Sequence, residues 1–464
     1  MIYTQHQWPT AAHGAVGFYS AAPCRNISGW VKTTNSLQIK HVAHWLFLLL
    51  TLLAASISFA DAPPLSKDDG YSLSNAISDA INSDPRVKAA RAEHTATQTE
   101  ITIARAGYYP SVSVQAGVGD IDGETEYQLN VRQMVYDWGR VASQVDNSRA
   151  ENNLTSEKLR LAQANAAFDT ADAFLRYVQT KKAVSIYNDY IVVLNDLLQI
   201  AEKRTQGQFS SRVEVDRAQV EKSRALESRA RYQGLMASAQ QALFEYTGNN
   251  PENLSLTAPP RLPVLSIFAN TAIVDKSISL APQVMADKEE VGRARAELKL
   301  RKAELWPQLN LEADWVRRQF NEEVDTDVIV ALRLRSETDF GLSSFRRPHA
   351  ARSRLAAREH QVRATRRDLR RSLQQLSALQ PALEARIAAL GAQSEGSLQI
   401  MATYQQQFIA GLRDFDDLLS VNRDHFDARR QKIELYTELL RQQYQVASDF
   451  GVLNDMLAQQ VHYD

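Results

Sequence analysis

Residues 307–315 read PQLNLEADW. Behind the proline, apolar and polar residues alternate strictly, so a β-strand here would carry leucine, alanine and tryptophan on one face and amides or carboxylates on the other. Three other stretches of about ten residues alternate in the same way, although Ile329 and Ala331 blur the polar face of the last one. The four apolar sets are Val112, Val114, Ala116 and Val118; Tyr127, Leu129, Val131 and Val135; Leu309, Leu311, Ala313 and Trp315; and Val328, Val330, Leu332 and Leu334.

The two strand pairs belong to a longer pattern that occurs twice. Two prolines 25 residues apart lead into each pair, and an Asp-aromatic-Gly triplet follows it. We therefore predict a tandem duplication. Its marks are Pro85, Pro110 and Asp137-Trp138-Gly139 in the first copy, and Pro282, Pro307 and Asp339-Phe340-Gly341 in the second. The predicted boundaries are 61–248 for the first repeat, with strands within 110–136; 249–279 for an irregular, proline-rich connector; and 280–464 for the second repeat, with strands within 307–335.

Long helices are predicted after each strand pair, where glycine and proline are scarce and alanine, glutamine, leucine, arginine and glutamate dominate. Residues 139–203 would extend about 98 Å as one helix at 1.5 Å per residue, and 341–405 would extend nearly as far. Such helices cannot fold into a compact core, so we predict a long helical tube beneath the strands. Two shorter stretches stacked end to end would span about the same length as one long helix. The pairs are 72–106 with 210–248, and 281–306 with 411–460.

The strands have the length and alternation of transmembrane β-strands, so the predicted fold class is a mixed α+β membrane protein. A soluble, half-buried sheet would alternate too. Aromatic residues favour the membrane, because they lie where strands meet helices, as in an interface girdle. They are Tyr108, Tyr109, Tyr136, Trp138 and Trp306.

Four strands from one chain cannot close a barrel, and an open strand edge is not tolerated in lipid. The chain must therefore associate with further copies of itself. Two copies would supply eight strands, the smallest known barrel, and three would supply twelve. The strand pattern is compatible with both.

An export signal is predicted near the N-terminus. The apolar run 45–59 follows Lys40 and ends in Ser58-Phe59-Ala60, which has small residues where signal peptidase reads them. At about 15 residues the run is short for a membrane anchor, which needs roughly 20. We expect residues 1–60 to comprise an over-long N-terminal extension and this signal peptide. Cys24, the single cysteine, lies within them, so no disulfide is expected in the mature chain.

No enzymatic motif is recognisable in the sequence. It shows no metal-spaced histidine pair, no Gly-rich phosphate loop and no nucleophile elbow. We expect a protein that is not an enzyme and binds no cofactor or metal. The net charge of −1 gives no reason to expect nucleic acid as a partner.

Two charged features have unremarkable interpretations. Ten arginines lie between Arg346 and Arg371. We interpret them as a solvated helix face, with contact to lipid phosphates as the alternative. His425 has no partner in view and is expected on a helix surface.

The repeat, the Pro-headed strands, the Asp-aromatic-Gly triplet and a Gly-containing helix break before Asp-Leu-Leu resemble the TolC family of outer-membrane channel proteins over residues 70–460. The resemblance implies a homotrimer with a twelve-stranded barrel in the outer membrane and a helical barrel in the periplasm. It also implies an exit duct that serves an inner-membrane transporter, of the ABC or another class, through a periplasmic adaptor (membrane-fusion) protein. Residues 332–354 are most similar to members of type I protein secretion. A multidrug efflux duct is the alternative within the family, and a soluble periplasmic coiled-coil interaction protein is the alternative outside it.

The same resemblance implies a gate at the periplasmic ends of the helices. Arg413 matches a gate arginine, Asp417 matches an aspartate of the pore constriction, and Asp416 lies beside it. Phe408 stands where the family usually has a gate-bracing tyrosine, so the phenol hydroxyl is absent. Glu214 matches the acidic partner of the arginine, which implies an Arg413–Glu214 link, and Gly207 lies one place from the expected glycine of the first repeat.

Overall fold

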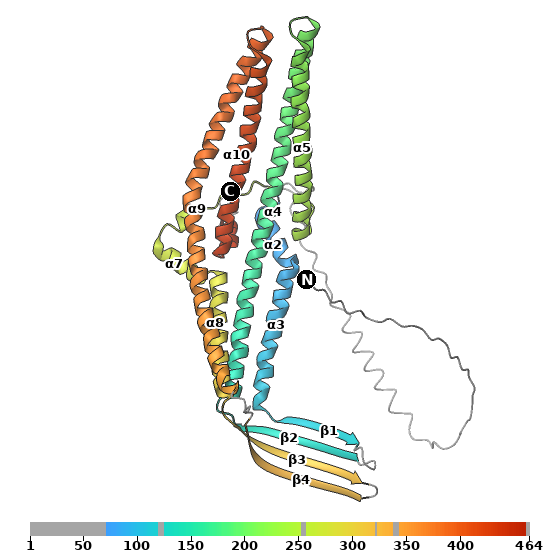
Figure 1. Ribbon diagram of the computed structural model, residues 1–464, viewed down its shortest axis with the longest axis vertical. Coiled ribbons are helices and arrows are strands. Elements are labelled where there is room, and N and C mark those ends of the chain that lie inside the picture. Colours follow the sequence, from blue (N-terminus) through green and yellow to red (C-terminus); the bar gives the residue numbers. More distant parts are fainter. Residues whose placement is uncertain (1–70, 119–124, 252–256, 321–322, 337–342, 461–464) are drawn as a thin grey trace, which may run out of the picture. The chain divides into compact units, whose positions relative to one another are not determined.

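The structure is a computed structural model, and it describes residues 71–118, 125–251, 257–320, 323–336 and 343–460. The expected signal peptide, Cys24 and the triplet Asp339-Phe340-Gly341 lie outside the described residues. Figure 1 shows long helices running side by side and one four-stranded sheet. The predicted combination of a small sheet with long helices is confirmed.

The helices account for most of the chain. The two longest are α4 and α9, which have 67 residues each, so each spans about 100 Å. Helices α3, α4, α8 and α9 lie beside one another in that order, α5 packs on α4, and α10 packs on both α9 and α4. The bounds are α2 Leu73–Ser83, α3 Pro85–Arg105, α4 Arg140–Gln206, α5 Arg212–Thr247, α6 Val264–Ile267, α7 Thr271–Leu280, α8 Pro282–Ala303, α9 Ser343–Ile409, α10 Phe415–Asp449 and α11 Leu453–Gln460, with a 3₁₀ turn η1 at Ala106–Tyr108.

Two sequence expectations about the helices were wrong. The stretch 72–106 is not one helix, because Asp84 ends α2 and accepts a hydrogen bond from the Arg86 amide at 2.7 Å, while Pro85 begins α3. The connector is not wholly irregular, because it contains α6 and α7. Asn270 caps α7 through a hydrogen bond from the Ala272 amide at 2.9 Å, and Val264, Phe268 and Ile278 bury their side chains at helical spacing.

The sheet is antiparallel in the order β1-β2-β3-β4, with bounds β1 Ser111–Val118, β2 Thr125–Tyr136, β3 Gln308–Phe320 and β4 Glu323–Arg335. The central pair β2–β3 joins strands of the two predicted repeats. Register places Val114 opposite Leu129, Leu129 opposite Trp315, and Trp315 opposite Val328. Residues directly opposite one another share a face, so the apolar sets of all four strands form one continuous surface.

Solvent exposure of that apolar surface is high in the single chain. Val114 is 74% exposed, Val330 66% and Leu334 68%, and none of the helices that the structure describes covers them. An exposed apolar face of this extent marks a surface that meets a partner or a membrane. A register shift between Met134 and Tyr136 also brings Tyr136 opposite Leu309, at the edge of the same surface.

The cores lie between helices rather than under the sheet. One cluster, around Phe174, Leu376 and Tyr444, packs α2, α4, α9, α10 and the connector together. A second cluster, around Leu194, Phe408 and Phe415, holds the far ends of α4, α5, α9 and α10. These ends, and the sheet at the other end of α4 and α9, are the two regions that carry the predicted site residues.

Candidate functional site

The polar face of the sheet is a network of ion pairs. The Glu312 carboxylate, whose side chain is 1% exposed, accepts hydrogen bonds from Arg132 at 2.8 Å, Arg333 at 2.9 Å and Arg335 at 3.3 Å. Arg333 also donates to Asp314 at 3.0 Å, and Asn130 donates to the same carboxylate. Three strands are thereby joined by side chains as well as by backbone. The alternation predicted a polar face but not that its charges neutralise one another.

The five aromatic residues expected at an interface are all exposed, by 45% to 70%. Three of them form a cluster where strands give way to helices: Trp138 stacks on Trp306 with ring centroids 5.1 Å apart, and Tyr136 meets Trp138 edge-on at 4.9 Å. Tyr108 and Tyr109 lie just before β1. Trp138 and Trp306 come from the two predicted repeats, so their stacking joins the strand–helix corner after β2 to the segment before β3.

The triplet Asp137-Trp138-Gly139 makes the corner from β2 into α4. Trp138 and Gly139 both have left-handed backbone, with φ of 57° and 80°. The buried Asp137 carboxylate accepts hydrogen bonds from the Gly139 amide at 3.0 Å and the Val141 amide at 2.5 Å. Aspartate therefore caps the helix that the tight corner begins.

Replacing Asp137 by alanine should lower the free energy of unfolding by about 1–2 kcal/mol, because the Gly139 amide before α4 and the Val141 amide in its first turn lose their acceptor. Thermal unfolding of the purified protein measures the change. Asp146→Ala is the matched control, since that carboxylate is 46% exposed and its nearest cation is Arg149 at 3.7 Å. Equal losses in both variants would contradict the capping role.

The loops at the far ends of the helices have the same backbone pattern. The Gln208 amide donates to Thr205 O and the Phe209 amide to Arg204 O; in the other loop, Gly411 donates to Phe408 O and Leu412 to Gln407 O. This is the helix-ending arrangement that needs one left-handed residue. Gln208 supplies it at φ 63° and Gly411 at φ 75°. The counterpart of Gly411 is therefore Gln208 rather than Gly207.

The predicted gate residues lie together at these ends, but the expected link between Arg413 and Glu214 does not form within the chain. Arg413 instead donates to Asp417 at 3.1 Å and lies 4.0 Å over the Tyr404 ring. Asp416 pairs with Arg217 of α5. Glu214 has a buried carboxylate oxygen with no partner among the described residues. The start of α10 explains the choice, because Arg413 lies just before the helix and Asp417 lies in its first turn, four residues further on.

Phe408 is fully buried and packs on Phe415, with ring centroids 5.2 Å apart. Arg204 of α4 lies 4.4 Å over the Phe408 ring and donates to the Phe408 carbonyl. This contact joins the ends of α4 and α9 where the family resemblance implied a tyrosine. Sequence reasoning missed Arg204, because nothing local marks an arginine that meets a ring some 200 positions away.

A buried carboxylate further along α5 was also missed. Glu221 accepts hydrogen bonds from Arg423 at 3.1 and 2.6 Å and from the Tyr190 hydroxyl at 3.0 Å, which links α4, α5 and α10. Burial alone would raise the pKa of Glu221, but the hydrogen bonds and charge of Arg423 hold that pKa below its usual range. The link is therefore fully present above the ordinary glutamate pKa and is lost as the pH falls through the lowered value.

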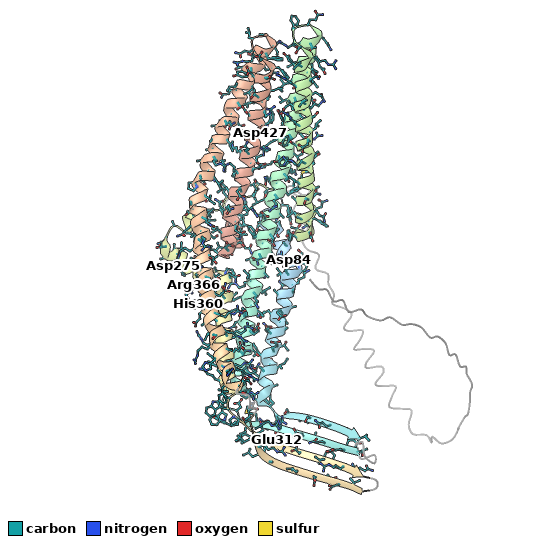
Figure 2. All side chains as sticks on the ribbon, viewed as in Figure 1. Asp84, Asp275, Glu312, His360, Arg366 and Asp427 are labelled. Carbon is teal, nitrogen blue, oxygen red and sulfur yellow. The ribbon has the colours of Figure 1, made fainter. Side chains whose placement is uncertain are left out.

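The structure also places the arginine cluster 346–371 and His425. Several arginines of the 346–371 cluster pair with acids on neighbouring helices: Arg354 lies 3.2 Å from Glu297, Arg358 lies 3.6 Å from Glu290, and Arg370 pairs with Asp275. Figure 2 shows Asp275, Arg366 and His360 on one side of the molecule, along α9. His425 is not on the surface as expected. It is 6% exposed, and its Nδ1 lies 2.8 Å from the Ser394 carbonyl.

The residues that the structure describes contain no cluster of three or more histidine, cysteine, aspartate or glutamate side chains placed to hold a metal ion. Across the same described ranges, no helix is both long and apolar enough to cross a membrane.

Known proteins match this chain in sequence. Residues 76–249 match the family model described as outer membrane efflux protein. Protein CyaE of Bordetella pertussis is 24% identical over 417 residues, which cover 84% of this chain and 85% of the relative.

Solved structures match over similar lengths. The CmeC outer membrane channel of Campylobacter jejuni aligns with a TM-score of 0.70 at 10% identity, over 84% of this chain and 88% of its own. The outer membrane protein VceC of Vibrio cholerae aligns with a TM-score of 0.70 at 15% identity, over 82% and 96%. The open-state MtrE outer membrane channel of Neisseria gonorrhoeae aligns with a TM-score of 0.64 at 16% identity, over 83% and 88%. These likenesses establish the fold.

Proposed function

We propose, from the premise that this chain belongs to the outer membrane efflux protein family, that it forms the exit duct of a tripartite export system. It is an outer-membrane channel protein and not an enzyme, and its helices extend into the periplasm. Substrates would pass from an inner-membrane transporter, through a periplasmic adaptor protein and this duct, to the exterior.

The observation that carries the proposal is the two-sided sheet. Its apolar face is exposed and carries no helix from the described part of the chain, whereas its other face neutralises Glu312 and Asp314 with arginines. Only the first face suits hydrocarbon, and the second suits a water-filled interior. The strands therefore separate lipid from an aqueous channel.

Closure of the barrel supports a homotrimer. The strand order leaves β1 and β4 as edges, and an edge in lipid must be paired. Pairing β4 of one copy with β1 of the next would close a twelve-stranded barrel from three chains. The matched loops at the helix ends, and the central pairing of β2 with β3, support a tandem duplication as the origin of the unit.

A type I protein secretion system is the proposed setting. The similarity of residues 332–354 to secretion members supports it, and Protein CyaE matches over most of both chains. A multidrug efflux duct is the second candidate, and the description of the family model favours it. Deleting the gene and measuring both the secreted proteins and the drug sensitivity of the cells separates the two settings.

Ion conduction tests the duct itself. Purified protein inserted into a planar lipid bilayer should give discrete single-channel currents, because the barrel and the helical tube form one water-filled path. The variant Val330→Arg, which places a charge on the apolar face and should not insert, is the negative control. Insertion without any conductance would contradict a duct.

We propose that Arg413, Asp417 and Asp416 control the opening at the helix ends. In three copies, the aspartates would gather around one axis, repel one another and attract cations. Arg413 offsets the charge of Asp417 at 3.1 Å, and Arg217 offsets that of Asp416. Phe408 and Arg204 hold the ends of α4 and α9 of each copy together behind this ring.

Replacing Arg413 by alanine should raise the single-channel conductance in a planar bilayer, because each freed Asp417 carboxylate increases the repulsion between neighbouring helix ends. Arg212→Ala is the matched control, since Arg212 is 87% exposed and lies 4.0 Å from Asp216. Glu214→Ala should change the conductance by the same factor with and without Arg413→Ala, because the two residues do not meet within the chain and should act independently. Unchanged conductance in Arg413→Ala would remove these residues from the gate.

A further inference from the structure

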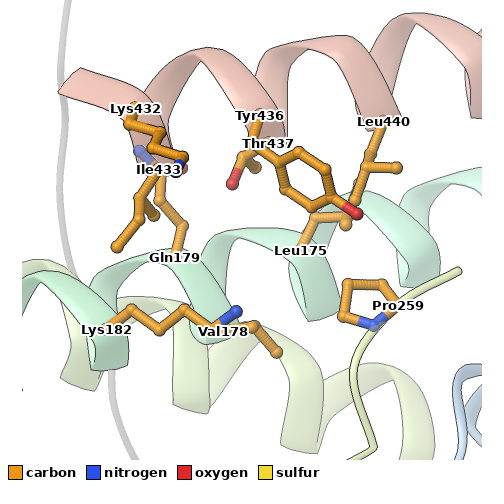
Figure 3. Close-up of a pocket in the computed structure, with 10 residues that line it drawn as sticks. All are labelled: Leu175, Val178, Gln179, Lys182, Pro259, Lys432, Ile433, Tyr436, Thr437 and Leu440. Atoms are coloured by element: carbon orange, nitrogen blue, oxygen red, sulfur yellow. The ribbon is translucent and has the colours of Figure 1, made fainter. Parts of the chain in front are cut away.

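A cavity of about 200 Å³ lies between α4, α10 and the connector, away from the sheet and the helix ends (Figure 3). Its apolar lining includes the buried Leu175, Leu440 and Pro259, together with Val178, Ile433 and the ring of Tyr436. Drug-sized pockets are about 300–1,000 Å³, so this cavity suits a smaller molecule.

Two lysines line this cavity from different helices. Figure 3 shows Lys182 on α4 and Lys432 on α10, and both side chains are exposed to solvent. No acidic residue lines the cavity, and among the described residues neither lysine takes part in an ion pair. Gly391 of α9 leaves room for one ammonium, since a Cβ there would come within 3.2 Å of the Lys432 Nζ atom.

The cavity wall is fixed before any ligand arrives. The Tyr444 hydroxyl donates to the Pro260 carbonyl at 2.6 Å, and the Leu262 amide donates to Gln443 at 3.2 Å. These bonds tie the connector to α10 beside the cavity. A rigid wall lowers the ordering cost of binding.

We propose that this cavity binds a small monocarboxylate with a compact apolar body, such as an aromatic acid. The carboxylate lies between Lys182 and Lys432, and the apolar body fills the space beside Leu175, Leu440 and Pro259. A carboxylate that reaches both ammonium groups is attracted to each of them. The bound acid thereby joins α4 to α10. The site does not depend on the proposed export role.

Benzoate is the probe, and benzyl alcohol is its uncharged counterpart of nearly the same shape. Saturation-transfer NMR on the full purified protein in detergent should show benzoate binding, with benzyl alcohol binding about tenfold more weakly. Lys182→Gln and Lys432→Gln should each weaken benzoate about tenfold. Lys181→Gln is the matched control, because Lys181 lies 5.8 Å over the Tyr177 ring and does not line the cavity.

Amide hydrogen exchange locates the bound acid independently. Benzoate should increase protection in residues 175–182 and 432–440, on the two helices that it joins. The proposal is overturned if benzoate does not bind, if benzyl alcohol binds equally well, or if Lys181→Gln weakens benzoate as much as the other two variants. Protection confined to other segments would also overturn it. Circular dichroism of each variant confirms that the helices are intact.

Discussion

Val330→Arg should abolish the detergent-resistant oligomer in the outer membrane. Val330 lies opposite Ala313 near the middle of its strand, on the apolar face, and is 66% exposed in the single chain. An arginine facing lipid at that depth costs about 2–4 kcal/mol, and each copy in the assembly bears this cost. The fraction of protein recovered as oligomer from outer membranes measures the effect.

The adjacent residue gives a matched control. Ile329→Arg introduces the same side chain on the other face, where position 329 lies opposite Asp314. A guanidinium there gains an acidic neighbour and an aqueous surrounding, so this variant should assemble normally. If both variants assemble, or if Ile329→Arg is the more harmful, the assignment of the two faces is wrong.

Glu312→Ala should destabilise the barrel by about 3 kcal/mol per chain, because removing one partner of a buried ion-pair network leaves the others uncompensated. Its carboxylate accepts from Arg132, Arg333 and Arg335, and its side chain is 1% exposed. We expect a lower melting temperature of the oligomer in detergent.

Glu126→Ala on the same face is the control for Glu312. Its carboxylate lies 3.6 Å from Arg318, and both side chains are nearly half exposed, so the loss should stay below about 1 kcal/mol. Similar losses in the two variants would show that the network around Glu312 contributes no more than an ordinary surface pair.

The strands were predictable because their signal is local. Between Gln308 and Trp315 every second residue is apolar and the residues between them are polar. A period of two does not fit a helix. The long helices followed from the same kind of local evidence. Asp84 and Asn270 were the local signals that went unused, since an aspartate before proline and an asparagine before a helical pattern are both common helix starts.

The contacts that complete the helix ends were not predictable in this way. Arg204 meets Phe408, and Glu221 meets Arg423, across more than 200 positions of sequence. Such pairs depend on which helices lie side by side, and no local pattern records that. His425 was misplaced for the same reason, because only the packing of α10 on α9 buries it.

The copy number of the assembled protein tests the central claim most directly. Native mass spectrometry of protein extracted from outer membranes in detergent should give three copies of the chain per particle, because three sets of four strands would close the proposed barrel. A particle of one or two copies that still conducts ions would contradict the account.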